Sequence, residues 1–319
     1  MSSPSSSCKR SALATLITAA TLGLPLTGWA QDNADPITLK EVEVTGERVE
    51  DPTAPVSGYR ADTALSATKT ATAIEDTAQS ISVITTDRID DLGAETVQET
   101  LRYSAGVGAE TFGLDSRGDW SRIRGFDPVI FLDGLQKTFG FYQSPRTEPF
   151  TLERIEILRG PASTLYGQGS AGGLINLVTK RPLEEQRTRL EIQVGNHDRK
   201  QLNIDTSGPL TDDGSLLYRL VAVGRDSDTQ VNFVEDNRTV LTPSLTWRPN
   251  DQLEWTLIGN FQEDRTGSTT QFLPIEGTLK PAPHGLPRIP IDVFISEPGF
   301  DQYQTRERSG TSLLAFAVN

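Results

Sequence analysis

Hydrophobic and polar residues alternate along most of the chain after Pro182. Stretches of about ten residues carry apolar side chains at every second position, which is the period of a β-strand with one apolar and one polar face. They lie around residues 190–194, 202–206, 218–222, 241–248, 255–262 and 306–318. Short turns and longer loops connect them, as in outer-membrane barrels. The pattern predicts roughly six antiparallel strands of a transmembrane β-barrel, with a soluble β-sandwich as the alternative.

Residues 63–182 show a mixed pattern instead. Residues 81–84 alternate like a short strand, and Thr86 is expected to cap a helix that ends at Gly93. Thr96 and Glu99 have the spacing of a capping box, which predicts a second helix to about residue 103. Two further strands precede a turn signal at 133–134. This region is therefore expected to be a small α+β domain with its own core.

One stretch of this domain, residues 152–182, combines a strand, a turn, a short helix, a glycine-rich loop and a second strand. Its loop 167–172 matches GxGxxG, the dinucleotide-binding pattern. That pattern must follow a strand and open a helix, whereas here a helix precedes it and a strand follows. An exported nucleotide-binding enzyme that uses the glycine run 167–173 is therefore only a distant alternative.

The first thirty residues predict a secretory signal peptide. Two basic residues precede an uncharged apolar run over 12–24, and a small-residue cleavage site ends at Ala30. A membrane anchor is the alternative, but the run is too short to span a bilayer comfortably. Residues 31–62 are poor in large apolar side chains and are expected to form a mobile arm. Within the arm, residues 37–45 alternate like a strand that could add to another protein's sheet edge, or else pair at the edge of the next domain.

Composition narrows the classes of function. The formal net charge is −13 at pH 7, so nucleic acid is not an expected partner, because its phosphates would repel the chain. The single cysteine, Cys8, lies in the predicted signal peptide, which leaves no disulfide or thiolate site in the mature chain. The two histidines, His197 and His284, are far apart, and no GxSxG motif occurs. The chain is therefore expected not to be an enzyme.

Two loops of the α+β domain combine aromatic and cationic side chains, one within residues 109–122 and one within 140–148. Their flat apolar faces and fixed positive charges suit a polar, anionic ligand that is rich in planar groups. Ordinary loop packing is the alternative. The residues concerned are Phe112, Arg117, Trp120, Phe141, Tyr142 and Arg146.

These patterns together resemble TonB-dependent outer-membrane receptors of the ferric-siderophore branch, and the ferric hydroxamate type in particular. The most specific stretches are 77–84, 123–126, 133–135, 152–182, 241–249 and 273–279. The resemblance implies an α+β plug domain followed by the first antiparallel strands of a transmembrane β-barrel, which has 22 strands when complete. The implied organisation is a signal peptide at 1–30, a TonB box and flexible arm at 31–62, a plug at 63–182 and an incomplete barrel at 183–319.

The resemblance also implies roles for residues. The TonB box is best placed at Glu41, Val42, Glu43, Val44 and Thr45, with residues 37–39 as a competing register. The apical plug loops with Arg117, Trp120, Phe141 and Tyr142 would face the pocket that holds the iron chelate. Arg124 and Arg159 resemble plug arginines that pair with barrel glutamates. The glycines at 167–173 would then reflect crowding against the barrel wall.

The function implied is energy-coupled uptake of a ferric siderophore across the outer membrane of a Gram-negative bacterium. The expected partners are the siderophore, TonB with its inner-membrane energising complex, and outer-membrane lipid, with the receptor a monomer. No cofactor is expected, because the iron arrives inside its chelate. One alternative is TonB-dependent uptake of another cargo, such as cobalamin or a glycan. Another is that the protein is a passive porin. Because an open sheet edge is not tolerated in lipid, roughly six strands are expected to be a fragment or a truncated product.

Overall fold

The computed structural model describes residues 51–137 and 145–316, so the predicted signal peptide and TonB box lie outside the described residues. Strands and helices alternate in the first part and strands dominate the second. In chain order the elements are β1 (Thr63–Ala64), β2 (Thr72–Ala73), β3 (Ser80–Thr85), α1 (Thr86–Leu92), α2 (Val97–Thr100), β4 (Val107–Gly108), β5 (Arg122–Ile123), β6 (Val129–Leu132), β7 (Leu135–Gln136), η2 (Pro149–Thr151), β8 (Leu152–Arg159), α3 (Ser163–Tyr166), β9 (Gly173–Thr179), β10 (Arg187–Val194), β11 (Lys200–Pro209), β12 (Leu216–Asp226), β13 (Asp236–Asn250), β14 (Leu253–Thr266), η3 (Pro283–Gly285) and β15 (Tyr303–Phe316).

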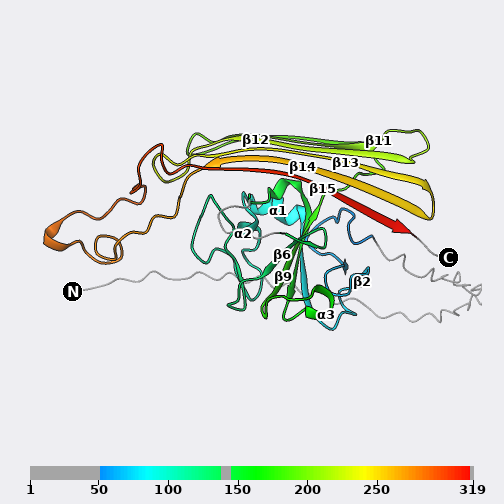
Figure 1. The fold of residues 1–319 in the computed structure, drawn as a ribbon, viewed down its shortest axis with the longest axis horizontal. Helices are drawn as coiled ribbons and strands as arrows, with labels where there is room; N and C mark the ends of the chain where they lie inside the picture. The colour runs from blue at the N-terminus through cyan, green and yellow to red at the C-terminus, as the bar shows by residue number, and fades with distance from the viewer. Residues whose placement is uncertain (1–50, 138–144, 317–319) are drawn as a thin grey trace, which may run out of the picture. The chain divides into compact units, whose positions relative to one another are not determined.

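Strands β10 to β15 form one antiparallel sheet in which each strand pairs with its neighbour in sequence (Figure 1). The polarity of its faces is the reverse of that in a soluble protein. On β11 the polar Gln201 and Asn203 are buried, whereas Leu202 between them is 43% exposed. A covered polar face and an open apolar face are the pattern of an outer-membrane barrel wall. The β-sandwich alternative is wrong, because a sandwich buries the apolar face of each sheet.

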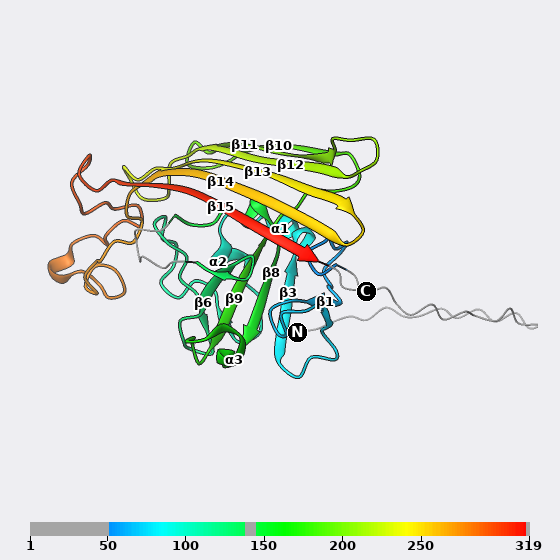
Figure 2. The ribbon, with the colours of Figure 1, turned by 45° about the vertical axis from the view of Figure 1, so that its right-hand side comes forward.

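The plug contains a five-stranded sheet in the order β3-β8-β9-β6-β7 (Figure 2). Within this sheet only the β6–β9 pair is parallel. The two strands of the 152–182 stretch, β8 and β9, lie side by side near the middle of this sheet. Alternate residues of both strands, Ile155 and Ile157 with Ile175 and Leu177, are buried in one hydrophobic cluster that includes residues of α1 and α2. A second, smaller cluster with Phe131, Leu158 and Leu174 lies on the opposite face, so the plug packs apolar side chains on both faces of this sheet.

The two helices begin close to where the sequence predicts. The cap of α1 is Thr85 rather than Thr86, because the Thr85 hydroxyl accepts from the Arg88 amide at 3.4 Å, while the Thr86 hydroxyl donates to the carbonyl of Glu153 at 2.6 Å. Gly93 ends α1 in the left-handed conformation, as predicted. Thr96 caps α2 as predicted, but the helix ends earlier than expected, at Thr100. None of the described helices is both long and apolar enough to cross a membrane.

The glycine-rich loop is crowded at its end, but not by the sheet of β10–β15. A Cβ on Gly173 would lie 1.9 Å from the carbonyl oxygen of Leu158, and one on Gly172 would lie 2.4 Å from that of Ile123. Both obstacles belong to the plug. Gly167 has open space around it and is needed instead for its positive φ of 70°. The expectation of crowding against a barrel wall is corrected accordingly: the close approach is between neighbouring segments of the plug.

Residues 51–62, expected in the mobile arm, pack against the plug. Thr53 and Ala61 are both buried. The backbone N–H of Gly58 donates to Asp87 Oδ2 at 2.6 Å, and the Tyr59 hydroxyl donates to Asp91 Oδ2, so this segment is tied to α1. The segment has few large apolar side chains of its own, and partners supplied by α1 and β8 hold it in place. Sequence composition does not reveal such partners.

Candidate functional site

The loop between β4 and β5 is organised around Asp115, a buried carboxylate. Its oxygens accept hydrogen bonds from Arg117 Nε at 2.8 Å and Nη2 at 2.9 Å, and from Trp120 Nε1 at 3.0 Å. Burial disfavours the charge, yet these donors outweigh it and hold the pKa of Asp115 below its ordinary value. The structure thus brings two of the predicted ligand residues together through a carboxylate that the sequence did not single out.

The exposed part of this loop is aromatic rather than cationic. Arg117 is only 9% exposed, whereas Phe112 is 60% exposed. The rings of Phe112 and Trp120 meet edge to face with their centroids 6.2 Å apart, and the guanidinium of Arg122 lies 5.5 Å from the Phe112 centroid. The predicted ligand residues Phe141 and Tyr142 lie outside the described residues. Within this loop Phe112 is exposed, whereas Trp120 is half-buried against it.

The same loop is docked onto the segment 267–302, which connects β14 to β15. The Ser116 hydroxyl donates to the carbonyl of Gly267 at 2.8 Å, and its amide donates to Thr269 Oγ1 at 3.0 Å. At the other end of the segment, Arg117 Nη1 lies 3.4 Å from the hydroxyl of Tyr303, with the guanidinium 5.3 Å from the ring centroid. The β4–β5 loop therefore contacts the start of this connection and the first residue of β15 that follows it.

Below the apical loop, a buried ion network joins the plug to the strands. Glu148, just before η2, is 3% exposed. Its Oε2 accepts from Arg225 Nη2 on β12 and Arg238 Nη1 on β13, each at 3.0 Å. Arg238 also donates to both oxygens of Asp264 on β14, at 2.9 and 3.0 Å. Burial opposes ionisation of Glu148, but the two arginines prevail and lower its pKa.

Arg146 extends this network from the plug side. Its Nη2 donates to Asp236 Oδ1 at 2.7 Å, while Asp236 Oδ2 accepts from Arg225 at 3.1 Å. The carbonyl of Arg146 accepts from Gln262 Nε2 on β14 at 2.7 Å. Arg146 was expected to belong to a ligand-facing loop. Its guanidinium instead binds the strands, close after the segment that the structure does not describe.

A second buried cluster lies between the end of β9 and the sheet. Asp205 of β11 accepts from Lys180 Nζ at 2.9 Å and from two nitrogens of Arg219, each at 2.8 Å. Arg219 Nη1 also reaches Glu153 of β8 at 3.3 Å. Burial lowers the pKa of Lys180, and the charge of Asp205 counteracts this. The plug was expected to end at residue 182, and Lys180, close to that point, contacts β11 of the sheet.

Phe150 supplies the apolar contact between these two clusters. It is buried with Val221 and Val223 of β12 and Val240 of β13 in one cluster. Lys180 Nζ lies 4.1 Å from its ring centroid, and the guanidinium of Arg189 lies 5.3 Å from it. The plug is therefore held on the sheet by one aromatic side chain flanked by buried ion pairs.

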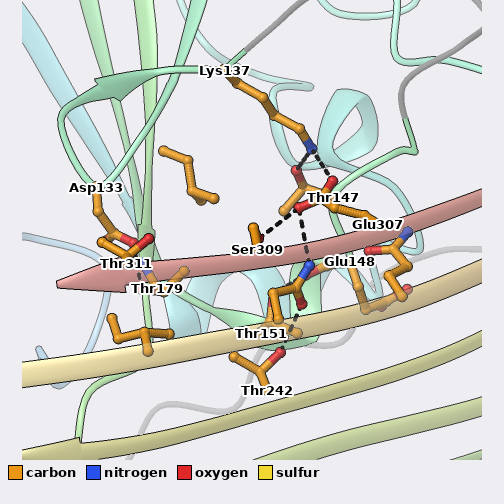
Figure 3. Close-up of a pocket in the computed structure, with 14 residues that line it drawn as sticks. Asp133, Lys137, Thr147, Glu148, Thr151, Thr179, Thr242, Glu307, Ser309 and Thr311 are labelled. Carbon is orange, nitrogen blue, oxygen red and sulfur yellow. Dashed lines mark hydrogen bonds and ion pairs between the residues drawn. The ribbon is translucent and has the colours of Figure 1, made fainter.

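A small polar cavity of about 30 Å³ lies between the plug and strands β13–β15. Figure 3 shows Lys137 reaching from the plug toward Thr147, with Glu307 and Ser309 coming from β15. Lys137 Nζ donates to Thr147 Oγ1 at 2.8 Å and lies 3.9 Å from Glu307. The volume suits about one water molecule. The cavity is therefore too small to hold a siderophore.

Asp119 in the β4–β5 loop is half-buried, and its compensation is weaker, since its carboxylate is bonded by the backbone of Gln98 rather than by an arginine. Asp119 Oδ1 is buried and has no hydrogen-bond partner among the described residues. Burial raises the pKa of Asp119, although the charges of Arg146, Arg238 and Lys137 counteract this. The pKa of Asp119 is therefore shifted upward, whereas arginine donors lower the pKa values of Asp115 and Glu148.

The two arginines predicted to pair with barrel glutamates, Arg124 and Arg159, lie close to each other in the plug. Arg124 is exposed with a positive φ of 51°. Arg159 donates to the carbonyl of Ala105 at 2.7 Å and to Ser82 Oγ at 2.9 Å, both within the plug. Burial, with the nearby charge of Arg124, lowers the pKa of Arg159. Strands β10–β15, as described, provide neither arginine with a glutamate partner, and the predicted pairing with barrel glutamates stays a prediction.

The residues that hold the plug on the sheet were missed by sequence reasoning, although a signal was present. The charged residues fall at strand positions where the alternation places polar side chains on the covered face. A charged side chain on the covered face of a strand needs a partner of opposite charge, because an unpaired buried charge is costly. The residues are Asp205, Arg219, Arg225, Arg238 and Asp264. Their plug partners Glu148 and Glu153 flank the start of the predicted strand 152–159 and carried no motif.

No group of three or more potential His, Cys, Asp or Glu ligands that could hold a metal ion occurs among residues 51–137 and 145–316. Residues 73–174 match the family model of the TonB-dependent receptor plug domain. The chain is 36% identical over 263 residues to the ferrichrome outer membrane transporter/phage receptor of Escherichia coli K12, an alignment that covers 81% of this chain and 35% of the relative. This chain belongs to the TonB-dependent siderophore receptor family.

Further comparisons agree with this assignment. The receptor is 36% identical over 276 residues to the metal-pseudopaline receptor CntO of Pseudomonas aeruginosa, which covers 85% of this chain and 37% of the relative. The structure of P. aeruginosa FpvA bound to heterologous pyoverdines superposes with a TM-score of 0.69 over 85% of this chain and 35% of that one, at 24% identity. That likeness supports the fold. The receptor chain spans about a third of the length of the curated relatives that it matches.

Family membership settles the class of the protein and its place in the cell. Its relatives are outer-membrane receptors of Gram-negative bacteria, and the receptor belongs in that membrane. The family consists of transporters and receptors, so the receptor is not an enzyme, as the sequence predicted. The predicted fold, an α+β plug followed by antiparallel strands of a barrel, is confirmed.

Proposed function

We propose that this receptor takes part in TonB-dependent, energy-coupled uptake of a ferric siderophore, with the plug providing both a ligand surface and a gate. The observation that carries the proposal is the aromatic pair of exposed Phe112 and half-buried Trp120, on a plug loop docked to the segment 267–302. Phe141 and Tyr142 would enlarge this surface. Glu41 to Thr45 would be the strand that TonB binds by β-strand addition. Iron would enter inside its chelate and would need no ligand from the protein.

Within this proposal the cargo is a ferric hydroxamate chelate. The likeness to a ferrichrome transporter supports this class. The charge of Arg117 is neutralised by Asp115 in a two-pronged ion pair, so this position offers little attraction to a strongly anionic chelate. The exposed aromatic faces suit a chelate of low net charge. A ferric chelate of low net charge therefore replaces, as the proposed ligand, the anionic ligand that the sequence pattern favoured.

Trp120 gives a direct test. Of the other three tryptophans in the sequence, Trp29 lies in the predicted signal peptide, and Trp247 and Trp255, on β13 and β14, can be replaced by Phe. Emission from Trp120 in the purified receptor should be quenched saturably by ferrichrome or ferrioxamine B at about micromolar concentration, and not by the iron-free forms. Phe112→Ala should weaken binding by about tenfold, whereas Phe261→Ala on β14 should not change it. Absence of any saturable response, together with unchanged uptake of labelled iron in a deletion strain, would contradict the proposal.

A second candidate is uptake of a metal chelate other than a ferric siderophore. The 36% identity to a metal-pseudopaline receptor favours it. The same titration with zinc and nickel chelates, and with cobalamin and glycans as further cargo, separates the candidates. A response confined to the zinc or nickel chelates would replace the ferric siderophore as cargo.

A further inference from the structure

Residues 51–67, here called the strap, precede the plug sheet and are not part of it. The only strand pairing of the strap is that of its β1 with β2, which follows the strap and joins two residues on each side. Several of its residues are nevertheless buried, including Ala64 at 3% exposure and Ser66 at 0%, although others such as Tyr59 are exposed. Something other than a β-ladder therefore holds the strap in place.

The first holding group is Glu156 of β8, whose side chain is fully buried. Its Oε1 accepts from the amide of Leu65 at 3.2 Å, and its Oε2 accepts from the amide of Ser66 at 2.9 Å and from the hydroxyl of Ser66. One carboxylate thus binds three donors of two consecutive strap residues. Hydrogen bonds to a charged acceptor are stronger than neutral ones.

The second holding group is Arg154, two residues earlier on the same strand and 2% exposed. Its Nη2 donates to the carbonyl of Ala54 at 2.6 Å, and its Nη1 donates to that of Thr63 at 3.3 Å. Since side chains alternate across a strand, Arg154 and Glu156 share the face opposite Ile155 and Ile157, which are in the plug core. A cation and an anion on one face of β8 therefore bind acceptors and donors along the strap.

We propose that Arg154 and Glu156 form a releasable clasp, and that it opens before the plug sheet when the chain ahead of residue 51 is pulled. The proposal rests on the energy-coupled function proposed above. Force that enters from the TonB box must pass through the strap before it reaches β3, and the strap is held largely by side chains. By contrast, β3 pairs with β8 along six residues, and β8 pairs with β9 over most of its length. The pulling force would act on the side-chain contacts of the strap one after another, whereas it would act on all the hydrogen bonds of the β3–β8 pairing at once. The strap contacts are therefore expected to break first.

The charges explain why such a clasp can open and close repeatedly. When the strap leaves, water can reach Arg154 and Glu156, and charged groups are strongly hydrated. An apolar clasp would gain nothing from that water. While the strap is bound, the same two charges are buried and need its backbone groups as partners. Arg154 and Glu156 therefore have backbone partners when the clasp is closed and are hydrated when it is open.

Cysteine accessibility in isolated outer membranes tests the clasp without any transport. Ala64→Cys reports on the strap, and Val97→Cys in α2 reports on the plug core, since both positions are buried. Glu156→Gln should raise the rate of maleimide labelling at Ala64→Cys by about tenfold and leave Val97→Cys protected. Arg154→Lys, which cannot reach two carbonyls at once, should act in the same direction. The matched control is Glu153→Gln, whose side chain binds Arg219 of the sheet, and it should not change labelling at Ala64→Cys.

Two results would overturn the clasp. One is that the reporter Ala64→Cys is labelled at the same rate whether it is combined with Glu156→Gln or with the control Glu153→Gln. The other is exposure of Val97→Cys together with Ala64→Cys, because the strap would then not open separately from the core. Energised cells supplied with the cargo test its role in transport, where Ala64→Cys should label faster while Val97→Cys stays protected. Iron uptake with a protected strap would refute the release role, whereas absence of uptake would refute the proposed function and not the closed clasp.

Discussion

At the scale of single residues, the carboxylates of Glu148 and Asp119 in the plug have pKa values shifted in opposite directions. Glu148 accepts from two arginines of the sheet, which lower its pKa despite burial. Asp119 has an oxygen with no hydrogen-bond partner among the described residues, and burial raises its pKa. Burial is common to both, so the direct donors decide the direction. The pKa of each therefore reports whether its charge stabilises the folded plug.

Glu148→Gln is expected to destabilise the plug by about 3 kcal/mol, because Arg225 and Arg238 would remain buried beside a neutral partner. The measurement is urea unfolding of the detergent-solubilised receptor at pH 7, followed by Trp120 fluorescence. Glu184→Gln is the matched control, since Glu184 pairs with Arg248 at a site where its side chain is 77% exposed. A control as destabilising as Glu148→Gln would show that burial of the pair does not matter.

The contribution of Glu148 should depend on pH with a defined sign. Its folded pKa lies below the ordinary value of 4.5, so its stabilising effect is complete above that value and is lost as the pH falls through the folded pKa. The difference in unfolding free energy between wild type and Glu148→Gln should therefore shrink below about pH 4. Asp119→Asn should instead raise stability at pH 7, since it removes a charge that burial disfavours. A stability difference for Glu148 that grows on acidification would contradict this account.

At the scale of elements, β8 connects most of the parts described above. Its pairing with β9 shifts register between Leu152 and Arg154, so Glu153 lies at an irregularity of the strand. Bulges of this kind re-aim side chains. Glu153 reaches Arg219 of the sheet, while Arg154 and Glu156 hold the strap and Ile155 and Ile157 lie in the core. One strand thus contacts the sheet, the strap and the plug core.

Gly173→Ala is expected to prevent close pairing of β8 with β9 and to destabilise the plug by about 3 kcal/mol or more, since the new Cβ would overlap the carbonyl of Leu158 and φ is +128°. Gly224→Ala on β12 is the control, because no atom lies within 4 Å of the position that its new methyl group would take and its φ is not positive. Thermal unfolding of both variants measures the difference. Similar melting temperatures for the two would show that the close approach at Gly173 is not required.

At the scale of the whole molecule, the sheet of β10–β15 has its apolar face open and its polar face against the plug. The outward residues include Leu241, Leu245 and Trp247 on β13, each more than 40% exposed. The inward ones on the same strand include Arg238 and Thr242, which are buried. This arrangement requires an apolar solvent outside, which a lipid bilayer provides. On the inner face, polar groups of the plug such as Glu148 supply the hydrogen-bond partners of the strand residues.

Leu245→Arg should oppose membrane insertion by about 2–4 kcal/mol, because it places a charge on the lipid-facing side of β13. The fraction of receptor folded into lipid vesicles, measured by its resistance to protease, should fall. Leu210→Arg, at the turn between β11 and β12 where the side chain is 55% exposed, should insert normally. If both variants insert like the wild type, the open face of the sheet does not meet lipid.

Much of the architecture could be predicted because it depends on local patterns. The turn Asp133–Gly134 joins β6 to β7 as expected, with positive φ at both residues, which short polar side chains and glycine tolerate. The six strands follow from a period of two, and Gly93 ends α1 as predicted. The candidate site was predicted less well. Arg117 and Trp120 do lie together, but Asp115, which holds them, and Glu148, which anchors the plug, carry no local signature.

The sequence by itself determined the fold class, the family and the order of its parts, since periodicity, caps, turns and family motifs are properties of neighbouring residues. Only the tertiary structure decided which charges meet, because Glu148 pairs with Arg238 across 90 positions and Glu156 binds Ser66 across 90. It also turned Arg117 inward onto Asp115 and kept Arg159 within the plug. The stability of a buried charge depends on partners brought together by folding, and no local pattern records them.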